Sequence, residues 1–218
     1  MLLPPDPVLP AGYAMRPMEW EDLPAVHALE ERLFPLDAWP LAFFEEELAQ
    51  AGPEHDGGTR AYRVITGPVP GRVPGPAFSG HNAPVRSALN VKGDGDPGDT
   101  EGETDAGEGA GVVLGYCGLM CVPPLADVQT IAVVPEAEGL GLGTAMLQWM
   151  VAESGRRRAK DLLLEVRADN PRAQALYARH GFEHIHTRAG YYPGDAGAGG
   201  GPGAGRVDAL IMRRHLVG

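Results

Sequence analysis

Residues 128–144 read VQTIAVVPEAEGLGLGT, and this stretch decides the fold. The β-branched and aliphatic residues up to Val134 predict a strand, which Pro135 ends. Glycines alternate with other residues from 139 to 143, and helical spacing of apolar residues begins at Leu142. Because glycine lacks a Cβ atom, an anion can approach the backbone there, and the first-turn amides and the helix dipole favour phosphate. The stretch therefore predicts a strand–turn–helix unit suited to a phosphate group.

Two familiar phosphate-binding motifs do not fit this turn. A dinucleotide fingerprint needs G-x-G-x-x-G, but Thr144 stands at the last glycine position. A P-loop needs Gly-Lys-Ser/Thr, and no lysine lies near the turn. Taken alone, the glycines leave open an incidental helix start.

A second signal is the strand-like LLLEVR of residues 162–167, which places Glu165 among apolar residues. A carboxylate inside an apolar strand must be paired, exposed where the sheet opens, or used chemically. Arg167 lies two residues on and on the same face, so pairing with Arg167 is the plainest structural interpretation.

A third signal is a short helix predicted at 171–180. Asn170 suits the N-cap, Pro171 suits the first turn, and Gly181 suits the position just after the C-cap. Tyr177 lies inside this helix. Taken alone, it is either a core aromatic residue or a catalytic acid.

Together and in this order, the three signals resemble the GNAT acetyltransferase superfamily. Within it, the sequence resembles the RimI-type enzymes, which acetylate the N-terminal alanine of small ribosomal subunit protein eighteen. The matching phrases cover roughly residues 14–66 and 111–214 and include IAV at 131–133, LEVRA at 164–168, Asn170, ALY at 175–177, GF at 181–182, YYP at 191–193 and DALIM at 208–212. The resemblance implies an α+β, three-layer α/β/α GNAT fold. In this fold a mixed, mostly antiparallel sheet of about seven strands is flanked by about four helices.

The resemblance also implies roles for individual residues, with acetyl-CoA as co-substrate. Glu165 would be the general base, and Tyr177 the general acid that returns a proton to the CoA thiolate. One position departs from the family, because Glu138 stands where Gln or Arg usually opens the pyrophosphate turn. Its carboxylate would either repel the pyrophosphate or point away from it. The residues that would bind the co-substrate are Ile131, Ala132, Val133, Gly139, Leu140, Gly141, Leu142, Gly143, Thr144 and Asn170.

The acceptor is expected to be an N-terminal amine. In the family a neutral amine attacks the thioester directly. An N-terminal amine, with a pKa of about 7.7–8.0, is partly neutral at pH 7, whereas lysine, at about 10.4, hardly is. The expected partner is a protein or peptide with a free N-terminus, basic in character and matching a ribosomal protein. Two alternatives stay open: a GNAT enzyme for lysine side chains or small-molecule amines, and a CoA-binding module without catalysis.

The chain is long enough for one domain, expected at 14–214, with a flexible N-terminus at 1–13. Residues 67–110 hold ten Gly and six Pro, with seven acids against three bases, and predict a disordered insertion. A second tract, 193–206, holds seven Gly in fourteen residues. Strands are expected at 14–17, 61–65, 111–122, 127–134, 161–167, 183–187 and 209–213, and helices at 23–33, 41–48, from 142, and at 171–180.

Charge and motif content narrow the function further. The net charge of −11 disfavours nucleic acid and anionic membrane as partners. The opening MLLPPDPVLP lacks a basic n-region, and no stretch approaches the ~20 apolar residues of a membrane span, so a soluble, cytoplasmic protein is expected. The seven histidines are scattered along the chain and there are only two cysteines, so no metal site is expected.

Overall fold

The computed structural model describes residues 7–52, 57–69, 112–193 and 205–216. A seven-stranded sheet in the order β1-β2-β3-β4-β5-β7-β6 runs through it. β4 and β5 pair in parallel, and every other neighbouring pair is antiparallel. The expected mixed, mostly antiparallel sheet is confirmed. Its strands are β1 (Ala14–Pro17), β2 (Arg60–Gly67), β3 (Val112–Val122), β4 (Leu125–Val133), β5 (Asp161–Arg167), β6 (Glu183–Tyr192) and β7 (Val207–His215).

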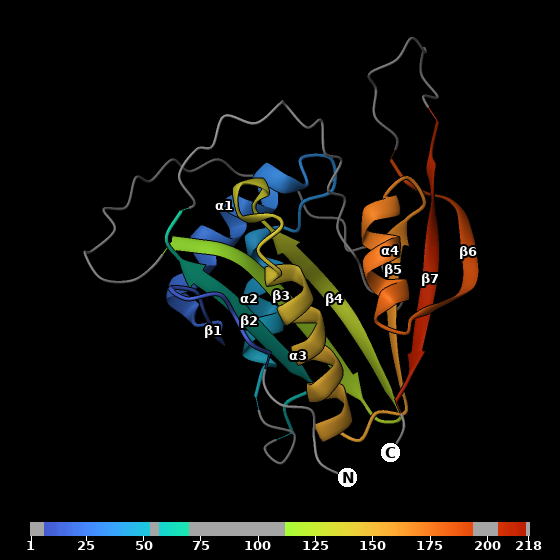
Figure 1. The fold of residues 1–218 in the computed structure, drawn as a ribbon, viewed down its shortest axis with the longest axis horizontal. Helices are drawn as coiled ribbons and strands as arrows, with labels where there is room; N and C mark the ends of the chain where they lie inside the picture. The colour runs from blue at the N-terminus through green and yellow to red at the C-terminus, as the bar shows by residue number, and fades with distance from the viewer. Residues whose placement is uncertain (1–6, 53–56, 70–111, 194–204, 217–218) are drawn as a thin grey trace.

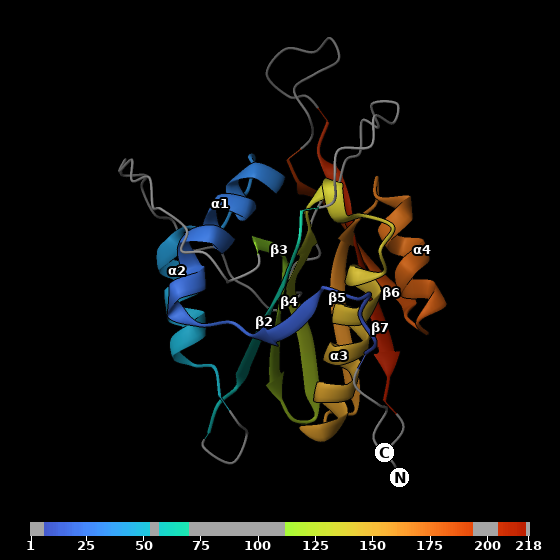
Figure 2. The same ribbon diagram turned by 60° about the vertical axis from the view of Figure 1, so that its left-hand side comes forward.

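Helices cover both faces of the sheet, as Figure 2 shows. α1 (Leu23–Leu33) and α2 (Leu41–Ala49) lie on one face, and α3 (Leu142–Arg156) and α4 (Pro171–Arg179) lie on the other. Single-turn 3₁₀ helices, η1 (Trp20–Asp22) and η3 (Pro135–Ala137), precede α1 and α3. The larger apolar core lies under α3 and α4, and a second core lies under α1 and α2. The arrangement is the expected three-layer α+β fold.

Two buried carboxylates attach the α1/α2 layer to the sheet. Glu30 on α1 accepts hydrogen bonds from the Trp39 backbone N–H, at 2.9 Å, and from the Tyr116 hydroxyl on β3. Glu47 on α2 accepts from the Tyr62 hydroxyl at 2.8 Å and pairs with Arg60 at 2.6 Å, both on β2. Because buried carboxylates require such partners, these bonds fix where the two helices sit on the sheet.

The centre of the sheet opens between β4 and β5. Among the described strands, β4 pairs with β5 only over Leu125–Asp127, against Asp161–Leu163. Beyond that point the two strands diverge, as Figure 1 shows. A register shift between Gly118 and Leu119 leaves Gln129 of β4 without a partner in the β3 ladder, and such a bulge bends its strand. The ends of β4 and β5 therefore lie apart, and the glycine-rich turn follows directly from β4.

The bounds predicted from local sequence signals are close to the observed ones for most helices and strands. Other strands are longer than predicted because they pair with strands that are distant in the sequence. α4 ends one residue before the expected bound, while β6 and β7 continue beyond the expected 183–187 and 209–213. Most of the expected insertion and of the glycine tract lies outside the described residues. Leu9 and Tyr13, in the stretch expected to be flexible, pack against the larger core. Across the described part of the chain, no helix is both long and apolar enough to cross a membrane.

Candidate active site

A pocket of about 310 Å³ lies where the end of β4, the glycine-rich turn and α4 come together. Two of the three sequence signals contribute to it: the strand–turn–helix stretch, through the last residues of β4 and the first turn of α3, and the helix predicted at 171–180, through one face of α4. The end of α1 completes it with Leu33 and Phe34. Its lining includes Ile131, Ala132, Val133, Glu138, Gly139, Gly141, Leu142, Gly143, Thr144, Asn170, Arg172, Tyr177 and Arg179.

Glycine is required at two positions of the turn. Gly139 and Gly141 have φ values of +79° and +80°, in the left-handed region that a side chain makes costly. Gly141 is the N-cap of α3, and its carbonyl accepts the first helical hydrogen bond, from the Ala145 N–H at 2.9 Å. The amides of residues 142–144 precede that bond and line the pocket, so they suit an anion at the positive end of the helix dipole.

α4 brings two predicted site residues to the pocket. The Asn170 side chain caps the helix, accepting from the Ala173 N–H at 3.0 Å. Tyr177 is 3% exposed, and its ring lies edge-to-face against Phe182 at 5.9 Å between centroids. Burial raises the pKa of Tyr177, so its hydroxyl stays protonated at neutral pH. A protonated phenol at a pocket wall can donate a proton.

Glu165 lies on the opposite face of β5 from Tyr177. Leu164 and Val166 pack with Tyr177 in the larger core, and strand alternation directs the Glu165 side chain the other way. Glu165 is fully buried, and its Oε1 accepts from Arg188 Nη1 at 2.7 Å. Its second oxygen, Oε2, has no hydrogen-bond partner among the described residues. Burial raises the pKa of Glu165, and Arg188 acts in the opposite direction.

The expected pairing of Glu165 with Arg167 is wrong. The Arg167 guanidinium instead pairs with Asp169 at 2.8 Å and donates to the Pro193 carbonyl at 2.9 Å. Asp169 lies just beyond the strand, and Glu165 pairs instead with Arg188 of another strand.

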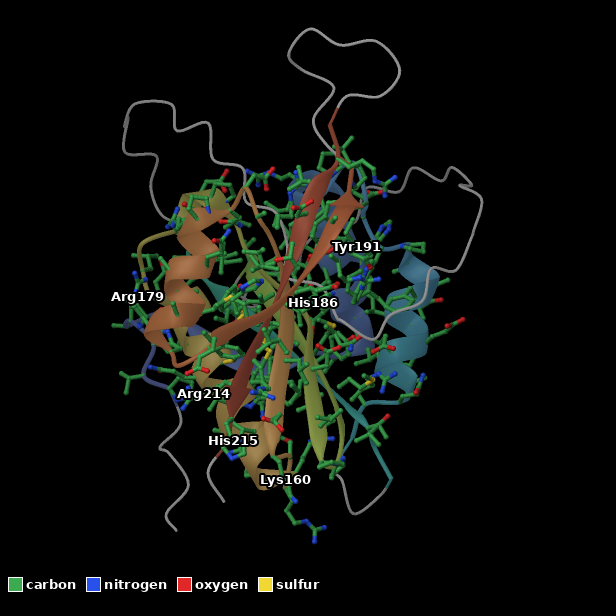
Figure 3. All side chains as sticks on the ribbon, turned by 90° about the vertical axis from the view of Figure 1, so that its right-hand side faces the viewer. Lys160, Arg179, His186, Tyr191, Arg214 and His215 are labelled. Carbon is green, nitrogen blue, oxygen red and sulfur yellow. The ribbon has the colours of Figure 1, made fainter. Side chains whose placement is uncertain are left out.

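Arg188 on β6 is the partner of Glu165 that the sequence reasoning missed. Its guanidinium lies 4.0 Å from the centroid of the Tyr191 ring, on the same strand, a distance at which a cation and an aromatic face attract. Figure 3 labels Tyr191 on the side of the sheet opposite α4. The predicted strand ended at Thr187, and a longer strand would have drawn attention to the next residue, an arginine.

The family match covers the part of the chain that builds this pocket. The sequence model of the acetyltransferase (GNAT) family matches residues 98–182, which include β4, the glycine-rich turn, α3, β5 and α4. The matched segment covers less than half of the chain, and over that segment the sequence is similar to the acetyltransferase (GNAT) family. The turn with its left-handed glycines and the helix carrying Tyr177 therefore lie within the segment that is similar to this family.

Comparisons with known proteins show how far the likeness extends. The ribosomal protein bS18-alanine N-acetyltransferase of Escherichia coli strain K12 is 40% identical over 40% of this chain and 53% of its own length. The chain thus spans about half the length of that curated relative. The crystal structure of the ribosomal-protein-S18-alanine N-acetyltransferase from Escherichia coli superposes with a TM-score of 0.61 at 23% identity, covering 94% of this chain and 95% of that one. The spermidine N-acetyltransferase of Vibrio cholerae, in complex with CoA and spermine, superposes at 0.60 with 14% identity, covering 95% and 97%.

Most of the predicted site residues lie together around the pocket. Of the twelve, all but Leu140 and Glu165 line the pocket. The Leu140 side chain packs against the larger core, and Glu165 lies on the far face of β5. The pocket suits a phosphate group, because the first-turn residues of α3 and two arginines of α4 line it. Within the described residues, no group of three or more His, Cys, Asp or Glu side chains is placed to hold a metal ion.

Proposed function

We propose that this protein transfers acetyl from acetyl-CoA to the α-amino group of a protein N-terminus, and that its acceptor is the N-terminal alanine of a small-subunit ribosomal protein. The observation that carries the proposal is the pocket, where the glycine-rich turn and Tyr177 line one cavity beside the opening between β4 and β5. The similarity to the Escherichia coli bS18-alanine enzyme supports the choice of acceptor.

The proposed binding mode uses backbone and side-chain groups around the pocket. The amides of residues 142–144 would hold the pyrophosphate of acetyl-CoA, and Asn170 would contact the co-substrate. Ile131–Val133, at the diverging end of β4, would bind the pantetheine arm. Acetyl-CoA supplies the acetyl group as an activated thioester.

Two side chains would move protons in this reaction. Glu165 would accept a proton from the attacking amine, directly or through a water, with Oε2 as the accepting atom because Oε1 is bound to Arg188. Tyr177 would donate its phenolic proton to the leaving sulfur, and burial keeps that proton in place at neutral pH. The two groups lie on opposite faces of β5, so acceptor and co-substrate would approach from opposite sides of the sheet.

Mass spectrometry of acetyl-CoA reactions with two basic peptides tests the proposal. One peptide has a free N-terminal alanine and no lysine, and the other has a blocked N-terminus and one lysine. We expect acetylation of the first peptide alone. Acetylation of the second alone would transfer the assignment to lysine side chains. No product on either peptide would leave small amines or a CoA-binding module without catalysis.

Arg188 gives a pH prediction for the same reaction. Its positive charge opposes the burial that raises the pKa of Glu165, so Arg188→Gln raises that pKa further. Because the ionised form of Glu165 is the base, the acidic limb of the kcat/KM profile should move to higher pH. Arg188→Lys keeps a positive charge and should largely restore the wild-type profile. If the acidic limb of the kcat/KM profile stays at its wild-type pH in Arg188→Gln, then either Glu165 is not the base or Arg188 does not affect its pKa.

A further inference from the structure

Two ion pairs hold the segment between β4 and α3 on its two sides. Glu136 pairs with Arg32 of α1, and Glu138 pairs with Arg172 of α4. In Figures 1 and 2 this segment lies between those two helices. Only the second pair belongs to the pocket, because Glu138 and Arg172 line it whereas Glu136 and Arg32 do not.

Two arginines of α4 line this end of the pocket, and they differ in whether they form an ion pair. Arg172 lies in the first turn of α4, and Arg179 lies two turns further along on the same pocket-lining face. Among the described residues, Arg179 has no ion-pair partner; Figure 3 shows it on the outer side of α4. Arg172 is 66% exposed in its side chain, so its ion pair with Glu138 is weakly held and can be exchanged.

We propose that Glu138 is an internal competitor for the phosphate groups of CoA: it holds Arg172 before CoA binds, and Arg172 exchanges this carboxylate for a phosphate when CoA enters. The inference rests on the proposed function, because it takes CoA as the ligand of the pocket. The exchange gives a role to the Glu138 carboxylate at the start of the phosphate-binding turn. Glu138 neither points away nor lies unpaired there; it occupies the cation that the phosphate needs.

If this exchange occurs, substitutions of the two residues change the affinity for CoA in opposite directions. Removing the Glu138 charge leaves Arg172 available and ends a repulsion, so binding tightens. Removing the Arg172 side chain deletes a charge-assisted contact to phosphate, so binding weakens. Both effects act at the surface, where salt screens them over about 10 Å at 0.1 M ionic strength.

Calorimetric titration of the full chain with CoA at low ionic strength tests the exchange. Glu138→Gln should tighten the Kd by about 3- to 5-fold, and Arg172→Ala should weaken it by about tenfold. The tightening by Glu138→Gln should shrink when Arg172 is already alanine, because only the direct repulsion is then left to remove. Glu136→Gln is the matched control: it makes the same change two residues away, outside the pocket, and should leave the Kd unchanged.

The outcomes separate this inference from the proposed function. A wild-type chain that binds no CoA contradicts the proposed function itself. A chain that binds CoA, but whose Kd is unchanged or weaker in Glu138→Gln, overturns the competitor role alone. Equal tightening with and without Arg172 would show that Glu138 acts by repulsion only, which also overturns the exchange.

Discussion

Tyr177→Phe should lower turnover by about 10²- to 10³-fold, the scale on which a positioned general acid acts. The substitution removes only the hydroxyl. The ring keeps its place in the larger core and its edge-to-face contact with Phe182, so the fold and the pocket wall should persist. CoA affinity, measured by calorimetry, should stay near the wild-type value. The loss should therefore appear in kcat with little change in the Kd for CoA.

The matched control for this change is Tyr13→Phe. Tyr13 packs against the same core but does not line the pocket, so turnover should be unaffected. If Tyr177→Phe keeps wild-type turnover, the leaving thiolate takes its proton from another source, and Tyr177 is only a core residue.

Glu165→Gln should lower kcat/KM by about 10²-fold for the N-terminal acceptor. Glutamine keeps the size and one oxygen of the side chain but cannot accept the proton. Arg188 loses its anionic partner, but its side chain is 37% exposed and can turn to water. The activity that remains should rise with pH as the acceptor amine itself deprotonates, with a pKa of about 7.7–8.0.

Glu153→Gln is a suitable comparison for that substitution. Glu153 also pairs with arginine, accepting from Arg157 at 2.7 Å, but it lies in the last turns of α3 and does not line the candidate site. Its loss should affect stability and leave kcat/KM unchanged. Wild-type kcat/KM in Glu165→Gln would mean that the amine loses its proton without this carboxylate.

The sequence predicts best the elements whose signals are local. The helix at 171–179 follows from Asn170, Pro171 and Gly181, each of which acts within one turn, and the structure shows the Asn170 cap directly. The glycine turn is equally local, because left-handed residues at 139 and 141 require glycine whatever the rest of the chain does. These local signals predict most of the residues that line the pocket.

Non-local pairing accounts for what the sequence could not show. Residues 183–187 of β6 are all exposed, so they carry little hydrophobic alternation, and the strand owes its length to its ladder with β7. Arg188 and Glu165 are separated by 23 positions in the sequence, and they meet because β7 lies between β5 and β6 in the sheet, an order that local sequence does not encode. The pairing of Glu138 with Arg172 likewise depends on how α4 packs beside the turn.

We infer that acetyl-CoA enters on the α3/α4 side of the sheet and meets an N-terminal amine at the opening between β4 and β5. A crystal structure with CoA joined covalently to the α-amine of a short alanine-initiated peptide tests it most directly. We expect the pyrophosphate on the amides of residues 142–144, Tyr177 beside the sulfur and the peptide on the Glu165 side. A conjugate bound elsewhere, such as in the pocket of about 620 Å³ lined by Trp149 and Arg63, would contradict it.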